Sequence, residues 1–305
     1  MNLKYLIIGA GGTGGCIGGY LKNADKDVTL IARGKHLARI KEKGLLIENS
    51  HSKDILLEDV KACTGDDYND KADVIFICIK GYSIDSIVSL IEKASHKETV
   101  IIPILNIYST GEKLQKKFPN LKVLDGCIYI ASEILEPGVI KQKGDIFKVI
   151  FGRRDGVTDD KVLKQIETDL KDSGITSILS KNIKLDAYRK FSYVSAQGAV
   201  GLYYNIKSGE IQSNPKYRND FVLCVNEIKK VGEAMGINLE EDITKTNLAI
   251  LDKLDKDMTT SLQKDIAKGS NSEMDGLIFE VVRNGEKYNV EVPTYKKIAD
   301  KYKKA

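Results

Sequence analysis

The sequence has few cysteines, and they are far apart. Its five cysteines form no CxxC pair, so neither a zinc site nor a disulfide framework is indicated. No apolar stretch approaches the ~20 residues that a membrane span needs, and no signal peptide is evident at the N-terminus. We therefore expect no metal, no membrane insertion and a location in the reducing cytoplasm.

An excess of one charge is also absent. The chain has 47 basic and 43 acidic residues, with a net charge of +4. This small bias gives no argument for a nucleic-acid partner, although small anionic ligands are compatible with it. With 305 residues, of which 42% are hydrophobic and 30% charged, the chain has an ordinary globular composition and is long enough for two domains.

Short apolar runs alternate with helical stretches over the first 130 residues. Runs rich in β-branched residues between helices indicate a parallel sheet covered on both faces. This pattern predicts a Rossmann-type, doubly wound α/β domain. The predicted strands are 5–9, 28–32, 45–49, 74–80, 99–105 and 122–130, and the predicted helices lie near 14–23, 35–43, 83–94 and 110–117.

The pattern changes beyond residue 130. A Pro-Gly turn within 131–152 predicts hairpins added at the edge of the sheet, and a helix is expected at 158–172. From about residue 182 helical patterns continue to the end of the chain, which predicts an all-α C-terminal domain. We accordingly divide the chain into domains 1–180 and 181–305.

The stretch GAGGTG directly follows the first predicted strand and opens a helix. Glycines in this pattern permit a tight turn, close approach of the backbone to a pyrophosphate, and close packing of helix on strand. The alternative is a purely structural glycine-rich turn. We interpret the stretch as a dinucleotide-binding loop formed by Gly9, Ala10, Gly11, Gly12, Thr13 and Gly14.

The end of the second predicted strand bears on which dinucleotide binds. An NAD site usually has Asp or Glu here to hold the ribose 2′-hydroxyl, whereas this chain has Arg33, followed by Gly34, Lys35 and His36. A guanidinium suits a 2′-phosphate, so NADP(H) is favoured. The alternative is that Arg33 simply begins a solvated basic helix.

At this point the sequence resembles the ketopantoate reductases (2-dehydropantoate 2-reductases) from end to end. The resemblance rests on GAGGTGG, VTLIARGKHLARIKEKGL, VIFICIKGYS, LNIYSTGEKL, ILEPGVI, AYRKF, SGEI and TSLQKDIAKGSNSEMD, in the family's order and near its spacings. It implies a first domain that binds NADPH and a helical second domain that closes over it. It further implies reduction of a small 2-oxo acid.

Two site residues follow predicted strands. Lys80 ends VIFICIK and Asn106 comes directly after TVIIPIL, and ligands of open α/β sheets bind beyond the carboxyl ends of strands. The resemblance implies that Lys80 holds the cofactor and that Asn106 contacts cofactor and substrate. A Lys extending off a strand end and a turn-forming Asn are the alternatives. The family usually has Gly after this Asn, but here Ile107 follows.

Lys190 begins a long segment that has no further charge until Lys207. The resemblance implies that Lys190 is the general acid that binds substrate and protonates the alkoxide left by hydride transfer. Tyr188 stands where the family has Trp, and the chain contains no tryptophan. The alternative is a Lys at a helix start with its ammonium group in water.

The resemblance also assigns roles near the C-terminus. It implies that Ser261 holds substrate and that Glu273 acts at the cofactor or in catalysis. Ser270 and Glu273 also match a capping box, in which Glu at the third helical position reaches back to the cap N–H. We leave both interpretations of Glu273 open, since they are not exclusive.

Three positions depart from the family's substrate-reading asparagines, namely Val194, Gly198 and Ser208. Losing buried hydrogen-bond partners costs ~1–3 kcal/mol each, enough to alter substrate preference. The predicted function is NADPH-dependent reduction of 2-dehydropantoate to pantoate in pantothenate biosynthesis. The alternatives are a reductase of a less polar 2-oxo acid and a non-catalytic NADP(H)-binding sensor. Whether the enzyme is a monomer or a homodimer is open.

Overall fold

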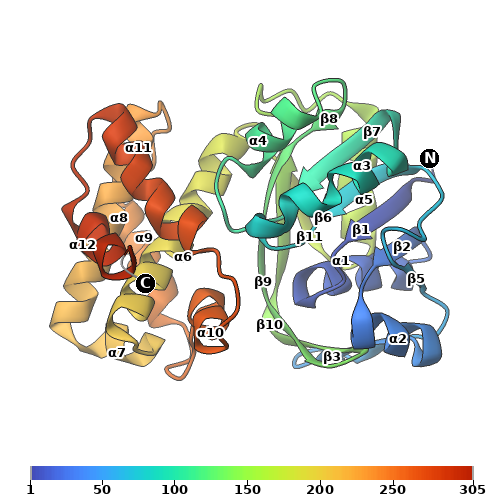
Figure 1. Cartoon of the computed structure of the whole chain (residues 1–305), viewed down its shortest axis with the longest axis horizontal. Helices are drawn as coiled ribbons and strands as arrows, with labels where there is room; N and C mark the ends of the chain where they lie inside the picture. The colour runs from blue at the N-terminus through green and yellow to red at the C-terminus, as the bar shows by residue number, and fades with distance from the viewer. Residues whose placement is uncertain (1, 304–305) are drawn as a thin grey trace. The chain divides into compact units, whose positions relative to one another are not determined.

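The computed structural model describes residues 2–303 and divides into two compact units. The first, an α/β unit, comprises Met1–Leu105 and Ser109–Ile183. The second, a helical unit, comprises Lys184–Ala305 together with the three-residue segment Asn106–Tyr108. Figure 1 shows the strands gathered in one unit and a set of helices in the other.

The main sheet of the α/β unit has six parallel strands. Their order is β5-β2-β1-β6-β7-β8, so the chain winds outward from β1 in both directions and the predicted doubly wound topology is confirmed. These strands are β1 (Lys4–Ile8), β2 (Asp27–Ile31), β5 (Lys61–Cys63), β6 (Ala72–Ile77), β7 (Ser95–Pro103) and β8 (Lys122–Val123). The connecting helices are α1 (Gly12–Asn23), α2 (Gly34–Lys43), the 3₁₀ segment η1 (Gly81–Ile87), α3 (Val88–Ala94) and α4 (Thr110–Lys117).

A second, five-stranded sheet corrects three predictions. The strand at 45–49 lies in it rather than in the parallel sheet. The predicted strand at 122–130 is divided between β8 of the parallel sheet and β9 of this one. The hairpin after residue 130 does not extend the edge of the first sheet, because its second strand, β10, is the central strand here and pairs with β9, β3 and β11. The hairpin turns at Gly138, whose φ is +80°. The sheet comprises β3 (Leu45–Asn49), β4 (Ile55–Leu57), β9 (Asp125–Glu136), β10 (Val139–Gly152) and β11 (Thr176–Leu179), and α5 (Lys161–Asp172) precedes β11.

Helix α1 packs against both sheets through its glycines. A Cβ at Gly18 would fall 2.4 Å from Leu30 of the parallel sheet, and a Cβ at Gly15 would fall 2.1 Å from Ile140 of the second sheet. Contacts this short exclude any side chain. The glycine-rich sequence of α1 therefore lets one helix bury two of its faces.

A buried carboxylate joins α5 to β1. Asp169 is 2% exposed and accepts hydrogen bonds from the Tyr5 hydroxyl at 2.6 Å, the Lys26 ammonium at 2.8 Å and the Gln165 amide at 3.0 Å. The pKa of Tyr5 is raised, mainly by burial and to a lesser extent by the hydrogen bond to Asp169. A buried charge is tolerated only with such partners, so this cluster fixes α5 on the sheet.

The helical unit confirms the predicted all-α C-terminal region. Its longest helix, α6 (Ile183–Tyr204), is held by the Ser195 hydroxyl, which donates to the Leu277 carbonyl at 2.5 Å and lies 2.6 Å from the Tyr295 hydroxyl. The remaining elements are α7 (Ser208–Ser213), α8 (Pro215–Ala234), α9 (Ile243–Asp252), α10 (Ser261–Ala267), the π-helical segment η2 (Asp275–Phe279), α11 (Glu280–Tyr288) and α12 (Pro293–Tyr302).

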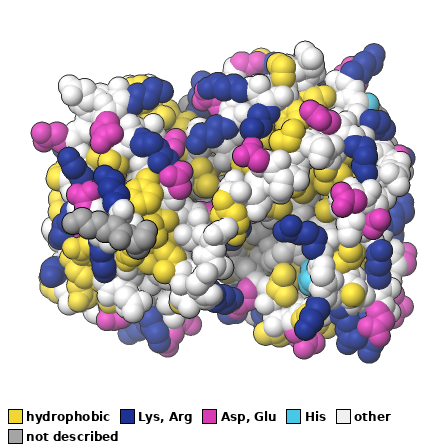
Figure 2. All heavy atoms as spheres, in the orientation of Figure 1, with side chains coloured by type: hydrophobic (Ala, Val, Ile, Leu, Met, Phe, Trp, Pro, Cys, Tyr) yellow, Lys and Arg dark blue, Asp and Glu magenta, His cyan; other side chains and the backbone are white. Residues whose placement is uncertain are grey.

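The distribution of charged side chains and the polarity of the helices agree with the composition of the chain. Basic and acidic side chains are interspersed over the face shown in Figure 2, as expected from their near-equal numbers. None of the helices within residues 2–303 is long and apolar enough to cross a membrane.

Candidate active site

The glycine loop lies at the carboxyl edge of the parallel sheet, between β1 and α1. Gly9 has a φ of +100°, which favours glycine, and the backbone N–H groups of Gly9 and Ala10 donate to the Ile31 carbonyl at 3.2 and 3.0 Å. A Cβ at Gly14 would fall 2.1 Å from the Gly9 carbonyl oxygen. The fold itself therefore requires glycine at the first and last positions of the loop.

Gly11 is different, because the fold does not need a glycine there. A Cβ at Gly11 would have no heavy atom within 4 Å, and the residue has an ordinary φ of −74°. Gly11 caps α1 without any side-chain hydrogen bond, so the first N–H groups of the helix are not capped by a side chain. Open space beside such a helix end fits a pyrophosphate approaching the backbone closely.

His36 joins this loop to the second sheet, a role that the sequence reasoning missed. Its Nδ1 accepts a hydrogen bond from the Gly138 N–H at 3.0 Å, which leaves Nε2 to donate to the Ala10 carbonyl at 2.8 Å. Both bonds are satisfied by the neutral ring. Burial lowers the pKa of His36 from 6.5, which favours the same neutral form.

Arg33 lies where the sequence placed it, directly after β2 as the N-cap of α2. Its side chain is exposed, and no ion pair within residues 2–303 engages its guanidinium. The first turn of α2 contains no acidic residue. The region can therefore accept an anion such as a 2′-phosphate.

Lys80 lies beyond β6, which ends at Ile77 rather than at Lys80 as predicted. It is half-buried and is the N-cap of η1, accepting the Ser83 N–H at its carbonyl at 2.9 Å. A Cβ at Gly9 would fall 2.7 Å from Ile79. The Lys80 loop and the glycine loop are therefore neighbours at one edge of the sheet.

Lys190 and Asn106 meet within the helical unit. The Lys190 ammonium donates to the Asn106 Oδ1 at 2.8 Å, although 84 residues separate them in the chain. Lys190 is only 8% exposed, so the interpretation of a Lys with its head in water is wrong. In such a low-dielectric environment, the hydrogen bond from the ammonium to the Asn106 amide oxygen is stronger than it would be in water.

Aromatic rings support this pair. Tyr108 meets Tyr188 edge to face with ring centroids 4.8 Å apart, and Tyr188 lies 5.7 Å from Phe191. The Tyr188 hydroxyl donates to the Ile228 carbonyl at 2.9 Å, and burial raises its pKa. Tyr188 is thus a buried ring that fixes the part of α6 from which Lys190 projects.

Glu273 is buried, at 5% exposure, just before η2. The predicted capping box is wrong. The Ser270 N–H and hydroxyl both donate to the Asp265 carbonyl, at 3.0 and 2.8 Å, and the π-helical segment begins only at Asp275. Glu273 instead accepts the Leu277 N–H at its backbone carbonyl at 3.0 Å. Single π-helical turns occur frequently at functional sites.

Ser261 is exposed in the first turn of α10. Its hydroxyl has no hydrogen-bond partner among residues 2–303, so the structure does not join it directly to Lys190. The helix start is fixed by Thr260 and Gln263, which form a capping box. The Gln263 amide also donates to the Gly201 and Ile206 carbonyls, at 3.0 and 2.8 Å, which ties α10 to the end of α6.

The three departures from the family pattern have distinct surroundings. The Ser208 hydroxyl donates to the Met258 carbonyl at 3.0 Å and accepts from the Gln197 amide at 3.1 Å, so it serves the fold. A Cβ at Gly198 would meet only Leu262, at 3.4 Å. Val194 packs against the apolar core. Because Lys190, Val194 and Gly198 are spaced four apart on α6, they share one helix face.

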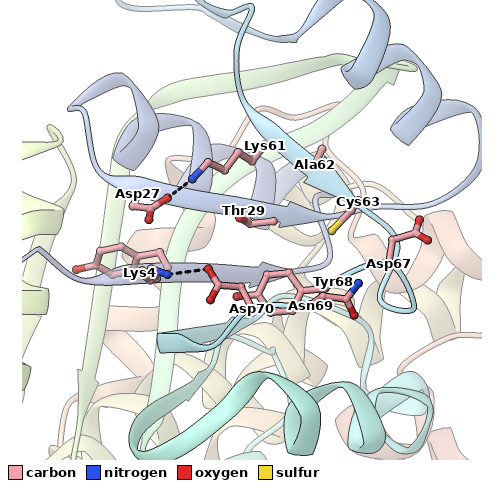
Figure 3. A pocket seen from close by; sticks show the side chains of 11 residues that line it. Lys4, Asp27, Thr29, Lys61, Ala62, Cys63, Asp67, Tyr68, Asn69 and Asp70 are labelled. Atoms are coloured by element: carbon pink, nitrogen blue, oxygen red, sulfur yellow. Dashed lines mark hydrogen bonds and ion pairs between the residues drawn. The ribbon is translucent and has the colours of Figure 1, made fainter.

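A hollow at the opposite edge of the parallel sheet is unrelated to this chemistry. It lies at the amino ends of β1 and β2 (Figure 3), and the ion pairs Lys4–Asp70 and Lys61–Asp27, each 2.7 Å long, lie across it. Ligands of such sheets bind at the carboxyl ends. Within residues 2–303, no group of three His, Cys, Asp or Glu side chains is arranged to hold a metal.

A glycine loop on a doubly wound sheet, with a buried Lys–Asn pair in a helical unit, defines a nicotinamide-dependent oxidoreductase. The family models for ketopantoate reductase PanE/ApbA and for its C-terminal region match residues 5–156 and 182–305. The chain belongs to the ketopantoate reductase family.

Individual relatives are distant. An uncharacterized oxidoreductase, YkpB, from Bacillus subtilis is 25% identical and the match covers 95% of each chain. The 2-dehydropantoate 2-reductase of Pyrococcus horikoshii is also 25% identical, with 95% of this chain and 93% of the relative covered. A solved ternary structure of D-mandelate dehydrogenase with NADH and anilino(oxo)acetate has a TM-score of 0.86 at 22% identity, covering 98% of this chain and 96% of that one.

Proposed function

We propose that this protein reduces 2-dehydropantoate to pantoate with NADPH, as a cytoplasmic enzyme of pantothenate biosynthesis. One observation carries the proposal: the buried Lys190 ammonium donates to Asn106 at 2.8 Å. The relative from Pyrococcus horikoshii supports the same substrate by its name. The domain roles follow, with residues 1–180 binding cofactor and 181–305 supplying substrate binding and catalysis.

The residues at the carboxyl edge of the sheet fit NADPH. Gly9, Ala10, Gly11, Gly12, Thr13 and Gly14 would hold the pyrophosphate, Arg33 the 2′-phosphate and Lys80 a further part of the cofactor. When bound, NADPH supplies the hydride that reduces the keto carbon. The structural neighbour carries NADH, so the preference for NADPH rests on the Arg33 guanidinium, which is exposed and has no ion-pair partner among residues 2–303.

Lys190 acts as the general acid. As the carbonyl oxygen of the substrate gains negative charge, a nearby ammonium stabilises that charge and then transfers its proton to the oxygen. Asn106 orients the ammonium through its Oδ1 and contacts substrate and cofactor. The partial burial of this pair strengthens its interaction with the developing charge.

Ser261 and Glu273 complete the proposed site. The exposed Ser261 hydroxyl has no hydrogen-bond partner in the described part of the chain and is available to bind substrate. Glu273 is buried. It lies near the segment that carries Asn106, since Ile107 packs on Gly276, which is three residues after Glu273. We assign Glu273 a role at the cofactor or in catalysis.

One set of residues favours a second candidate, a reductase of a less polar 2-oxo acid. Val194 and Gly198 offer no hydrogen-bonding side chain on the face of α6 that carries Lys190, and Ser208 is engaged by Met258 and Gln197. Leu262 borders Gly198. These surroundings suit an apolar substituent better than the hydroxyl of 2-dehydropantoate.

The experiment is NADPH oxidation with 2-dehydropantoate, run beside NADH and a panel of 2-oxo acids with branched or aromatic substituents. Rapid NADPH-dependent turnover of 2-dehydropantoate supports the proposal. A higher kcat/KM for an apolar acid selects the second candidate. Tight NADPH binding without turnover of any acid would contradict both and indicate a sensor.

A further inference from the structure

A three-residue segment carries Asn106 into the helical unit. Asn106–Tyr108 belongs to that unit, whereas the neighbours on both sides, Leu105 and Ser109, belong to the α/β unit. Ser109 has a φ of +63°, which is uncommon outside glycine. The chain therefore enters and leaves the helical unit within a few residues, and the contacts of this short segment with the helical unit set the position of Asn106.

Ile107, the middle residue of the segment, packs against Gly276 of η2. A Cβ at Gly276 would fall 2.6 Å from the Ile107 Cδ1, 2.6 Å from its Cγ1 and 2.8 Å from its Cγ2. Real Cβ atoms do not approach so closely, so Ile107 occupies the space that a side chain at Gly276 would fill. We call this contact the Ile107–Gly276 socket.

The glycine at this position serves packing rather than backbone conformation. Gly276 lies in the π-helical segment Asp275–Phe279 and has no positive φ, so alanine could adopt its backbone conformation. Gly276 is buried, and the three nearest atoms to its Cβ position all belong to Ile107. The family's usual Gly after the Asn could not fill this socket, which makes the pair a feature of this sequence.

The residues on either side of Ile107 contact Lys190, the proposed proton donor, and its neighbour Tyr188. Asn106 precedes Ile107, and its Oδ1 accepts the Lys190 ammonium at 2.8 Å. Tyr108 follows Ile107 and packs edge to face on Tyr188, which is two residues before Lys190. The position of the Asn106 side chain is thus set by the two residues that follow it. Ile107 contacts η2 and Tyr108 contacts α6.

We propose that Ile107, seated on Gly276, is a positioning residue that holds Asn106 against Lys190 and so aims the ammonium for proton transfer. This inference rests on the proposed function for its catalytic consequence, but the placement of Lys190 can be tested without turnover. A misplacement of a catalytic group by about 1 Å can cost ~100-fold in rate.

The test uses three variants of the socket. Two are the single substitutions Gly276→Ala and Ile107→Gly, and the third is a double variant that carries both Ile107→Ala and Gly276→Ala. The matched control is Gly285→Ala in α11, where a Cβ would also be blocked, at 2.8 Å from Val292. We expect Gly276→Ala and Ile107→Gly each to lower kcat by at least ~10-fold with the KM for NADPH unchanged, and to shift the pH profile of kcat. The double variant should recover most of the kcat lost in Gly276→Ala, because it removes the clash.

A second readout does not depend on the substrate. Competitive acetylation followed by peptide mass spectrometry gives the labelling rate of Lys190 relative to Lys184, which is exposed on the same helix. The ratio should rise by several-fold in Gly276→Ala and Ile107→Gly but not in Gly285→Ala. If no 2-oxo acid is turned over, the proposed function fails and this ratio alone decides the role of the socket.

An unchanged ratio and an unchanged pH profile in folded Gly276→Ala would overturn the inference. Equal effects of Gly276→Ala and Gly285→Ala would also overturn it, since they would indicate general loosening of the helical unit. If Gly276→Ala fails to fold, Ile107→Gly and the double variant give the same two readouts.

Discussion

Alanine substitutions at two glycines of the loop should separate cofactor binding from folding. A Cβ at Gly14 would fall 2.1 Å from the Gly9 carbonyl oxygen and 2.8 Å from the Cys78 Cβ, so α1 must move away from the sheet. A Cβ at Gly11 has no heavy atom within 4 Å, and its φ of −74° suits alanine. Gly14 thus serves the fold, whereas the proposal assigns Gly11 to the ligand.

The expected magnitudes differ accordingly. Overpacking costs about 1–3 kcal/mol, and Gly14→Ala should reach the upper part of this range because the obstructing atom belongs to the backbone. Gly11→Ala should leave the free energy of unfolding within about 0.5 kcal/mol of wild type. Its methyl group would hold the pyrophosphate off the loop and remove hydrogen bonds to a charged group worth roughly 1.5–3 kcal/mol. This corresponds to about a 10- to 150-fold loss of NADPH affinity.

Denaturant titration measures the free energy of unfolding, and NADPH fluorescence measures the Kd. The reasoning is refuted if Gly11→Ala binds NADPH as tightly as wild type, or if it is destabilised as much as Gly14→Ala. The first result would remove the pyrophosphate from the loop. The second would show that Gly11, like Gly14, is required by packing.

Three further predictions concern the α/β unit. Arg33→Ala should weaken NADPH binding by about 10- to 100-fold and leave NADH binding unchanged; an equal loss for both cofactors would contradict its role at the 2′-phosphate. Because the pKa of His36 is lowered in the folded state, the unfolded chain binds more protons than the folded chain as the pH falls towards and below about 6.5. The free energy of unfolding therefore decreases as the pH falls through this range. His36→Ala should flatten the dependence of unfolding free energy on pH between 7.5 and 5.5, and an unchanged slope would refute this. Asp169→Ala should lower the free energy of unfolding by about 3 kcal/mol. This is near the lower end for a broken buried ion pair, because Lys26 is partly exposed. A loss of less than ~1 kcal/mol in denaturant titration would contradict this prediction.

The sequence predicted the parts of the fold that depend on local pattern. The alternation of apolar runs and helices, with GAGGTG after the first run, was sufficient for the doubly wound topology and for the position of the glycine loop, although the short strand β5 was missed. The destination of the strand at 45–49 was not predictable in this way. Its apolar residues suit either sheet, and its pairing with β10 depends on a partner about 90 residues away.

The candidate site divides in the same way. Lys190 could be singled out because it is the last charge before a long uncharged segment, and its burial is consistent with that interpretation. It does not begin the helix, however, since α6 starts at Ile183. Its hydrogen bond to Asn106 and the Ile107–Gly276 socket join segments 84 and 169 residues apart, and no local pattern marks them. His36 was visible in the run RGKH, but the hydrogen bond that it accepts from Gly138 depends on a hairpin that the sequence placed in the wrong sheet.

The most direct measurement of the central claim is kcat with NADPH for wild type, Lys190→Ala and the control Lys184→Ala, using the best 2-oxo acid of the panel. The account predicts that Lys190→Ala lowers kcat by ~10²–10⁴ with the Kd for NADPH nearly unchanged, whereas Lys184→Ala, an exposed position on the same helix, behaves as wild type. Full activity in Lys190→Ala would contradict the account, because the buried ammonium held by Asn106 could not then be the proton donor.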